Sequence, residues 1–106
     1  MLVSAGRSSA QEAGLASYYH DYFTGKRTAS GENYDPNKLT AAHKSLPIGT
    51  LIKVTNLDNG KSVIVIINDR GPFVPGRIID LDKVAFQKIA SICAGVITVK
   101  MEEIAN

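Results

Sequence analysis

Two carboxylic acids and one histidine are the side chains in this sequence most able to transfer protons. Asp69 follows the apolar run 63–67 after a single residue, so it is expected at the rim of a hydrophobic core. Glu32 lies in a polar loop, and His43 follows two alanines. A carboxyl group at a core rim can act as a general acid, and histidine changes its charge near neutral pH. Each also has a structural interpretation: Asp69 as a turn residue paired with Arg70, and His43 as a packed side chain.

Other kinds of site have less support. The chain has two histidines and one cysteine, Cys93, without the spacing of a zinc site, so we expect no metal and no cofactor. No nucleophile-elbow motif surrounds a serine. Cys93 has apolar neighbours and is expected to pack in the core as a small apolar side chain.

Composition indicates one globular domain. The chain has 106 residues, is 44% hydrophobic and carries a net charge of +2 without a basic cluster, so a nucleic-acid partner is not expected. The longest aliphatic run, residues 63–67, is too short for a transmembrane segment. We interpret residues 1–12 as a flexible N-terminal tail and residues 13–106 as the folded domain, a monomer.

Short apolar runs separated by Gly, Pro, Asn and Asp are typical of small strands. The clearest unit is a hairpin around Asn59-Gly60, and Asp82 is suited to cap a helix that ends at Gly95. A long loop is expected over 24–36. The predicted strands cover residues 15–19, 39–43, 50–56, 61–68, 77–81 and 96–102. A closed barrel would remove the sheet edges that so short a chain cannot cover.

Six motifs in order along residues 14–101 resemble the rare lipoprotein A (RlpA) family. They read GLASYY, TASGENYD, LTAAH, LPIGT, NDRGPF and RIIDL. The resemblance implies a mainly β fold, a six-stranded double-psi β-barrel with one or two short helices, which expansins and some endoglucanases share. Because a fold does not fix a function, the site is considered separately.

The resemblance also implies an activity. Characterised members are lytic transglycosylases that cleave the bond between N-acetylmuramic acid (MurNAc) and N-acetylglucosamine (GlcNAc) in peptidoglycan, preferring peptide-free strands and forming 1,6-anhydro ends. Glu32, His43 and Asp69 match the positions that the family uses for activity. We expect Asp69 to be the acid and base, Glu32 to stabilise positive charge and His43 to orient a carboxylate, although Asp69 and Glu32 can exchange roles.

A groove along the barrel would bind the glycan. Its expected lining residues, each with an alternative interpretation as turn or packing residue, are Asp35, Thr40, Tyr18, Tyr34 and Arg70. The tyrosines would stack on sugars, and Arg70 would bind acetamide or lactyl groups. The alternative functions are an endoglucanase-like hydrolase and a non-catalytic, expansin-like glycan-binding module. The substrate implies export to the periplasm or cell envelope, near the septum, although this chain shows no signal peptide or lipid anchor.

Overall fold

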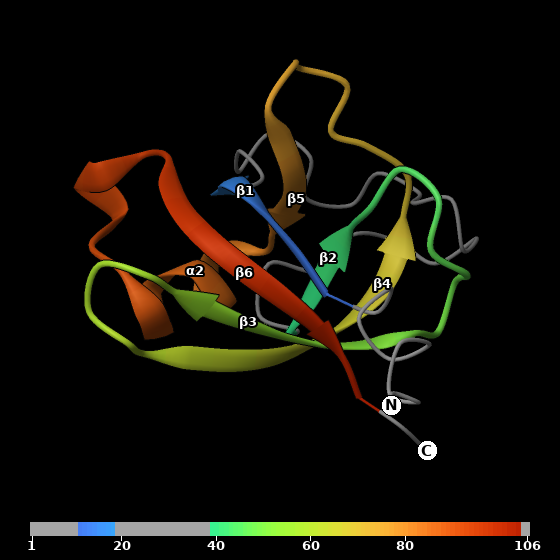
Figure 1. Cartoon of the computed structure of the whole chain (residues 1–106), viewed down its shortest axis with the longest axis horizontal. Coiled ribbons are helices and arrows are strands. Elements are labelled where there is room, and N and C mark those ends of the chain that lie inside the picture. Colours follow the sequence, from blue (N-terminus) through green and yellow to red (C-terminus); the bar gives the residue numbers. More distant parts are fainter. Residues whose placement is uncertain (1–10, 19–38, 105–106) are drawn as a thin grey trace, which may run out of the picture.

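Six strands close into a barrel in the part of the chain that the structure, a computed structural model, describes: residues 11–18 and 39–104 (Figure 1). The strand order around the barrel is β1-β5-β2-β4-β3-β6. The elements are β1 (Gln11–Tyr18), β2 (Thr40–Ala42), β3 (Leu51–Asn56), β4 (Ser62–Asp69), β5 (Arg77–Leu81), the helix α2 (Lys83–Ile89), the short 3-10 helix η2 (Ile92–Ala94) and β6 (Ile97–Glu103). The predicted mainly β, six-stranded barrel is therefore confirmed.

Two parallel strand pairs shape the barrel. β1 pairs with β5 and β2 pairs with β4 in parallel, whereas the other four pairings are antiparallel. Each parallel pair has a register shift, after Leu15 in β1 and after Ala41 in β2. Such bulges change the face toward which the following side chains point. The two shifts therefore determine the direction of the side chains at the ends of the paired strands.

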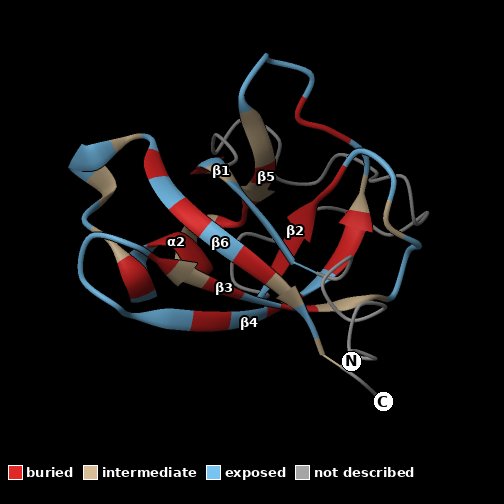
Figure 2. Ribbon diagram, viewed as in Figure 1, coloured by how far each residue is buried: buried red, intermediate tan, exposed pale blue. Residues whose placement is uncertain are grey.

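The core forms from the alternating side chains of the strands. Figure 2 shows buried and exposed residues alternating along β6, as the period of two in a strand requires. Phe86 and Ile89 of α2 are fully buried and complete the same core. Burial of each such side chain contributes about 1.5–3 kcal/mol. The carbonyl of Ile89 also accepts side-chain amides from Asn56 at 2.8 Å and Asn59 at 3.0 Å, which fix α2 against the hairpin.

The hairpin and the start of the helix agree with the prediction. β3 and β4 are joined around Asn59-Gly60, and Gly60 has the positive φ of 77° that such a turn requires. The side chain of Asp82 accepts the amide of Ala85 at 2.7 Å and caps α2. Both elements depend on local sequence signals.

Two predictions after the helix were wrong. α2 ends at Ile89 instead of Gly95, because Ala90 is extended and the separate turn η2 follows. Gly95, with φ 72°, ends η2. The helical spacing therefore does not continue to Cys93, whose amide is bound by the Ser91 hydroxyl and which is exposed instead of packed.

The N-terminal boundary also differs. Residues 11 and 12, assigned to the tail, begin β1 because they pair with Glu102 and Met101 of β6. The rest of the expected tail and the long loop at 24–36 lie outside the described residues. Among residues 11–18 and 39–104, no helix is long and apolar enough to cross a membrane.

Candidate active site

Four residues on neighbouring strands form a row on the face of the sheet that points away from the barrel core. Ser17 and Ala42 are buried there, and Asp80 and Asp69 are half-buried. Ser17 of β1 is the register partner of Asp80, Asp80 pairs with Ala42, and Ala42 pairs with Asp69. Side chains directly opposite one another point to the same face of a sheet. We call Ser17, Asp80, Ala42 and Asp69 the carboxylate row. It spans three strand spacings, roughly 14 Å.

The direction of the row follows from the residues beside it. Ala16, Ile79, Ala41 and Ile67 are fully buried in the barrel core. Because successive side chains of a strand alternate between faces, the residues next to them along the first three strands point away from the core. The row is therefore separate from the hydrophobic interior.

A bulge brings Asp69 to this outer face. In β4, Val63, Val65 and Ile67 point into the core, and uninterrupted alternation would direct Asp69 there as well. The register shift opposite β2 pairs Ile67 with Ala41 but Asp69 with Ala42, so one residue is skipped. Asp69 is half-buried, and its Oδ1 accepts the backbone amide of Arg70 at 2.8 Å. The bulge thus converts an inward position into a carboxylate at the surface.

His43 lies next to Asp69 and has one defined tautomer. Its backbone amide donates to the carbonyl oxygen of Asp69 at 3.1 Å. Its ring Nδ1 accepts the amides of Ser45 and Leu46, both at 3.1 Å, and so must be unprotonated. In the neutral ring the proton is on Nε2, which lies 3.3 Å from Oε1 of Glu12. The buried imidazole is therefore a hydrogen-bond donor at Nε2.

The other predicted site residues are placed as follows. Arg70 is exposed and its Nη1 donates to the carbonyl of His43 at 3.3 Å. The ring of Tyr18 packs on Phe86 with centroids 4.9 Å apart. Thr40 is buried at the start of β2. Three predicted residues lie outside the described part of the chain: Glu32, Tyr34 and Asp35.

Two further residues that could serve the site were not predicted from the sequence. The Oδ1 of Asp80 accepts a hydrogen bond from the hydroxyl of Ser17, and Phe73, two residues after Gly71, has 77% of its surface exposed. The signal for Asp80 was a charge between the buried residues Ile79 and Leu81. The signal for Phe73 was an aromatic side chain directly after Gly71-Pro72.

A buried carboxylate holds β2 in place. Asp82 accepts the amides of Thr40 and Ala85, which connects β2 to the start of α2. Burial raises the pKa of the Asp82 carboxyl, although both amides oppose this shift. Because Thr40 begins the strand that leads to His43, the fully buried Asp82 supports the site indirectly, through β2.

Solved structures share this fold. The chain superposes on a Streptomyces papain inhibitor with a TM-score of 0.73 and 24% identity, over 90% of this chain and 94% of that protein. An expansin from Clavibacter michiganensis gives a TM-score of 0.71 and 20% identity, over 91% of this chain and 51% of the expansin. At these identities the similarity concerns the fold alone.

Sequence relatives are much more similar. A sequence model of the family described as lytic transglycolase matches residues 11–101. Proteins named endolytic peptidoglycan transglycosylase RlpA are 54% identical over 91 residues in Campylobacter jejuni and 55% identical over 89 residues in Pasteurella multocida. These matches cover 86% and 84% of this chain but 33% and 30% of the relatives, so the chain spans about a third of their length. By its sequence and its barrel, the chain belongs to the RlpA family of double-psi β-barrel proteins.

Proposed function

We propose that this domain is a lytic transglycosylase that cleaves the bond between MurNAc and GlcNAc in peptidoglycan strands. The observation that carries the proposal is the bulge that brings Asp69 to the outer face beside His43. The names of the relatives supply the substrate class. The substrate lies outside the cytoplasmic membrane, so we also propose a periplasmic or cell-envelope location.

Asp69 is proposed as both acid and base. It first donates a proton to the glycosidic oxygen as the bond to C1 of MurNAc breaks and the GlcNAc hydroxyl leaves. The resulting carboxylate then removes the proton from the 6-hydroxyl of MurNAc as that oxygen bonds to C1. The ring closes as a 1,6-anhydro sugar, and no water is consumed. General acid and base assistance of this kind contributes about 10² to 10⁴ in rate.

A second carboxylate is proposed to stabilise the positive charge on the sugar. Asp80 lies two strand spacings from Asp69 in the carboxylate row, roughly 10 Å between backbones. The hydroxyl of Ser17 holds its Oδ1 in place. Glu32 remains proposed for the same role.

His43 is proposed to orient the reacting groups. Because backbone amides occupy Nδ1, only its Nε2 hydrogen can point to a carboxylate or a sugar oxygen. Glu12 accepts that hydrogen in the structure, and its half-exposed side chain can yield to substrate. His43 is thus a donor whose tautomer is fixed by the fold.

The glycan is proposed to pass over the half-buried Asp69 and Asp80 of the carboxylate row. Phe73 presents an exposed ring on which a sugar can stack, beside the end of β4. Tyr18 ends β1 and Thr40 begins β2, and both strands contribute a residue to the row. Tyr34 and Asp35 remain proposed groove residues. Arg70 is proposed for acetamide or lactyl groups, and the preference for peptide-free strands stays part of the proposal.

The ends of the products test the reaction. Peptide-free strands are incubated with the protein in heavy-oxygen water, and the fragments are analysed by mass spectrometry. A transglycosylase gives fragments one water lighter than hydrolysis products, without heavy oxygen. Reducing ends that contain heavy oxygen would instead show a hydrolase. Binding without fragments would show a glycan-binding module and contradict the proposal.

A further inference from the structure

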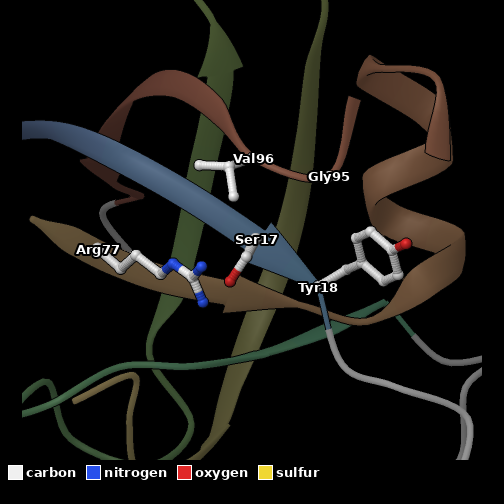
Figure 3. Close-up of a pocket in the computed structure, with 5 residues that line it drawn as sticks. All are labelled: Ser17, Tyr18, Arg77, Gly95 and Val96. Atoms are coloured by element: carbon white, nitrogen blue, oxygen red, sulfur yellow. The ribbon is translucent and has the colours of Figure 1, made fainter. Parts of the chain in front are cut away.

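A cavity of about 210 Å³ opens at the β1 end of the carboxylate row (Figure 3). Its lining consists of Ser17, Tyr18, Arg77, Gly95 and Val96. It lies three strand spacings from Asp69, roughly 14 Å along the sheet. A glycan strand that is bound at Asp69 and extends by this distance toward β1 places a sugar beyond the cleaved bond at the cavity.

Arg77 supplies a positive charge to the cavity. It begins β5 opposite Leu15 and is half-buried. Within the described residues, its guanidinium forms no hydrogen bond or ion pair, in contrast to that of Arg70, which binds the carbonyl of His43. Figure 3 shows the Arg77 guanidinium pointing toward Ser17. Its planar set of donors matches a carboxylate.

The Ser17 hydroxyl adds an acceptor. Its proton is donated to Asp80, so only its lone pairs are available to a ligand. The carboxylate of Asp80 does not line the cavity. The cavity thus combines a cationic donor with a neutral acceptor. The ring of Tyr18 points away from Ser17 and packs on Phe86 of α2 (Figure 3). Val96 therefore supplies the apolar side chain of the wall, which suits a small methyl group.

One ligand chemistry satisfies these features together. The cavity requires an anionic group, a nearby N–H or O–H donor and small apolar substituents. A muramyl residue without a stem peptide carries a lactyl carboxylate at C3 and an acetamide N–H at C2, each with a methyl group. Once a peptide is attached, the carboxylate becomes a neutral amide and the match to Arg77 is lost.

We propose that this cavity binds the free lactyl carboxylate of a muramyl residue next to the cleaved disaccharide. Arg77 binds the carboxylate and Ser17 accepts the acetamide N–H. The inference rests on the proposed function and assigns to Arg77 the selection of strands from which the peptides have been removed.

Binding to two matched probes tests the assignment. The probes are a peptide-free tetrasaccharide of peptidoglycan and the same sugar with its lactyl carboxylates converted to N-methylamides. Binding is measured by titration calorimetry with the Asp69→Asn variant, because this variant should not cleave the probes. We expect the free acid to bind about tenfold or more tightly than the amide, as for a charge-assisted hydrogen bond. Adding Arg77→Gln should remove this difference, whereas Arg77→Lys should retain part of it.

Lys61→Gln is the matched control. It removes one positive charge from the β3–β4 hairpin, outside the cavity, and should keep the preference for the free acid. Equal melting temperatures show that the Arg77 variants remain folded. A preference that persists in Arg77→Gln, or no preference in Asp69→Asn alone, overturns the inference. Cleavage of the free-acid strands by the wild type is measured in parallel. If the wild type forms no anhydro ends, the proposed function is contradicted; if it forms them but the preference does not depend on Arg77, only the inference about the cavity is contradicted.

Discussion

The backbone amide of His43 donates a hydrogen bond to the carbonyl oxygen of Asp69 at 3.1 Å. The bond joins the end of β2 to the end of β4, directly after the bulge that directs Asp69 to the outer face. Asp69 is the last residue of β4 and His43 directly follows β2, so the sheet positions both backbones. Such placement is what the proposed catalytic role of the two residues requires.

The tautomer of His43 can be tested through stability. His43→Ala removes the acceptor for the amides of Ser45 and Leu46, and we expect the free energy of unfolding to fall by about 1–3 kcal/mol. In His43→Asn, the side-chain oxygen can occupy the place of Nδ1 and should recover part of this loss. Urea denaturation measures both variants. Equal destabilisation by Ala and Asn would show that the Nδ1 contacts are unimportant.

Asp80 should affect the rate of cleavage. Asp80→Asn removes the second carboxylate of the row, and kcat should fall by about 10- to 1000-fold, as when one electrostatic group at a developing charge is lost. Ser17→Ala, which removes the hydrogen bond to Asp80, should lower kcat less, and Ser17→Thr should restore it. The exposed Glu103→Gln serves as the control of equal charge change. A normal kcat in Asp80→Asn would exclude the role.

Phe73 should contribute to binding more than to chemistry. Phe73→Ala removes an exposed ring, so KM should rise about three- to tenfold with little change in kcat. Phe73→Tyr retains the ring and should resemble the wild type. Ile48→Ala, also at an exposed apolar residue, should have no effect. Steady-state kinetics on peptide-free strands distinguishes these cases, and an unchanged KM in Phe73→Ala contradicts sugar stacking.

Asp82 should make stability depend on pH. Burial raises its pKa in the folded protein above the ordinary value of 3.8, so between these two values the folded state binds more protons than the unfolded state. Its contribution to stability is therefore greatest below pH 3.8, falls as the pH rises through the folded pKa and is constant above it.

The matched variant is Asp82→Ser, which retains a capping oxygen for α2 but does not titrate. The free energy of unfolding of the wild type minus that of this variant should decrease from acid to neutral pH. Urea denaturation over this range measures the difference. A difference that increases with pH would show that the folded protein lowers the pKa of Asp82.

Local signals predicted much of the fold. The Asn59-Gly60 turn and the Asp82 cap each depend on residues close in sequence, and both elements formed as predicted. The end of the helix was predicted wrongly because the extended Ala90 separates α2 from η2, and no Gly or Pro marks that break. Cys93 was misplaced for the same reason.

The site was only partly predictable. Asp69 and His43 stood out by residue type and by their family motifs, and the structure brings their backbones together. The pairing of Ser17 with Asp80 depends on a parallel register between strands 63 residues apart, which no local pattern contains. The bulge of β4 opposite β2 is likewise a property of two strands and not of one.

The role of Asp69 as catalytic acid and base is tested by the rate of 1,6-anhydro product formation in Asp69→Asn, compared with Asp58→Asn. Both changes replace an acid by its amide, but Asp58 lies exposed in the β3–β4 turn. With equal melting temperatures, Asp69→Asn should lose about 10² to 10⁴ in rate and Asp58→Asn should keep the wild-type rate. Anhydro ends formed at the wild-type rate by Asp69→Asn would contradict the assignment of Asp69 as the catalytic acid and base.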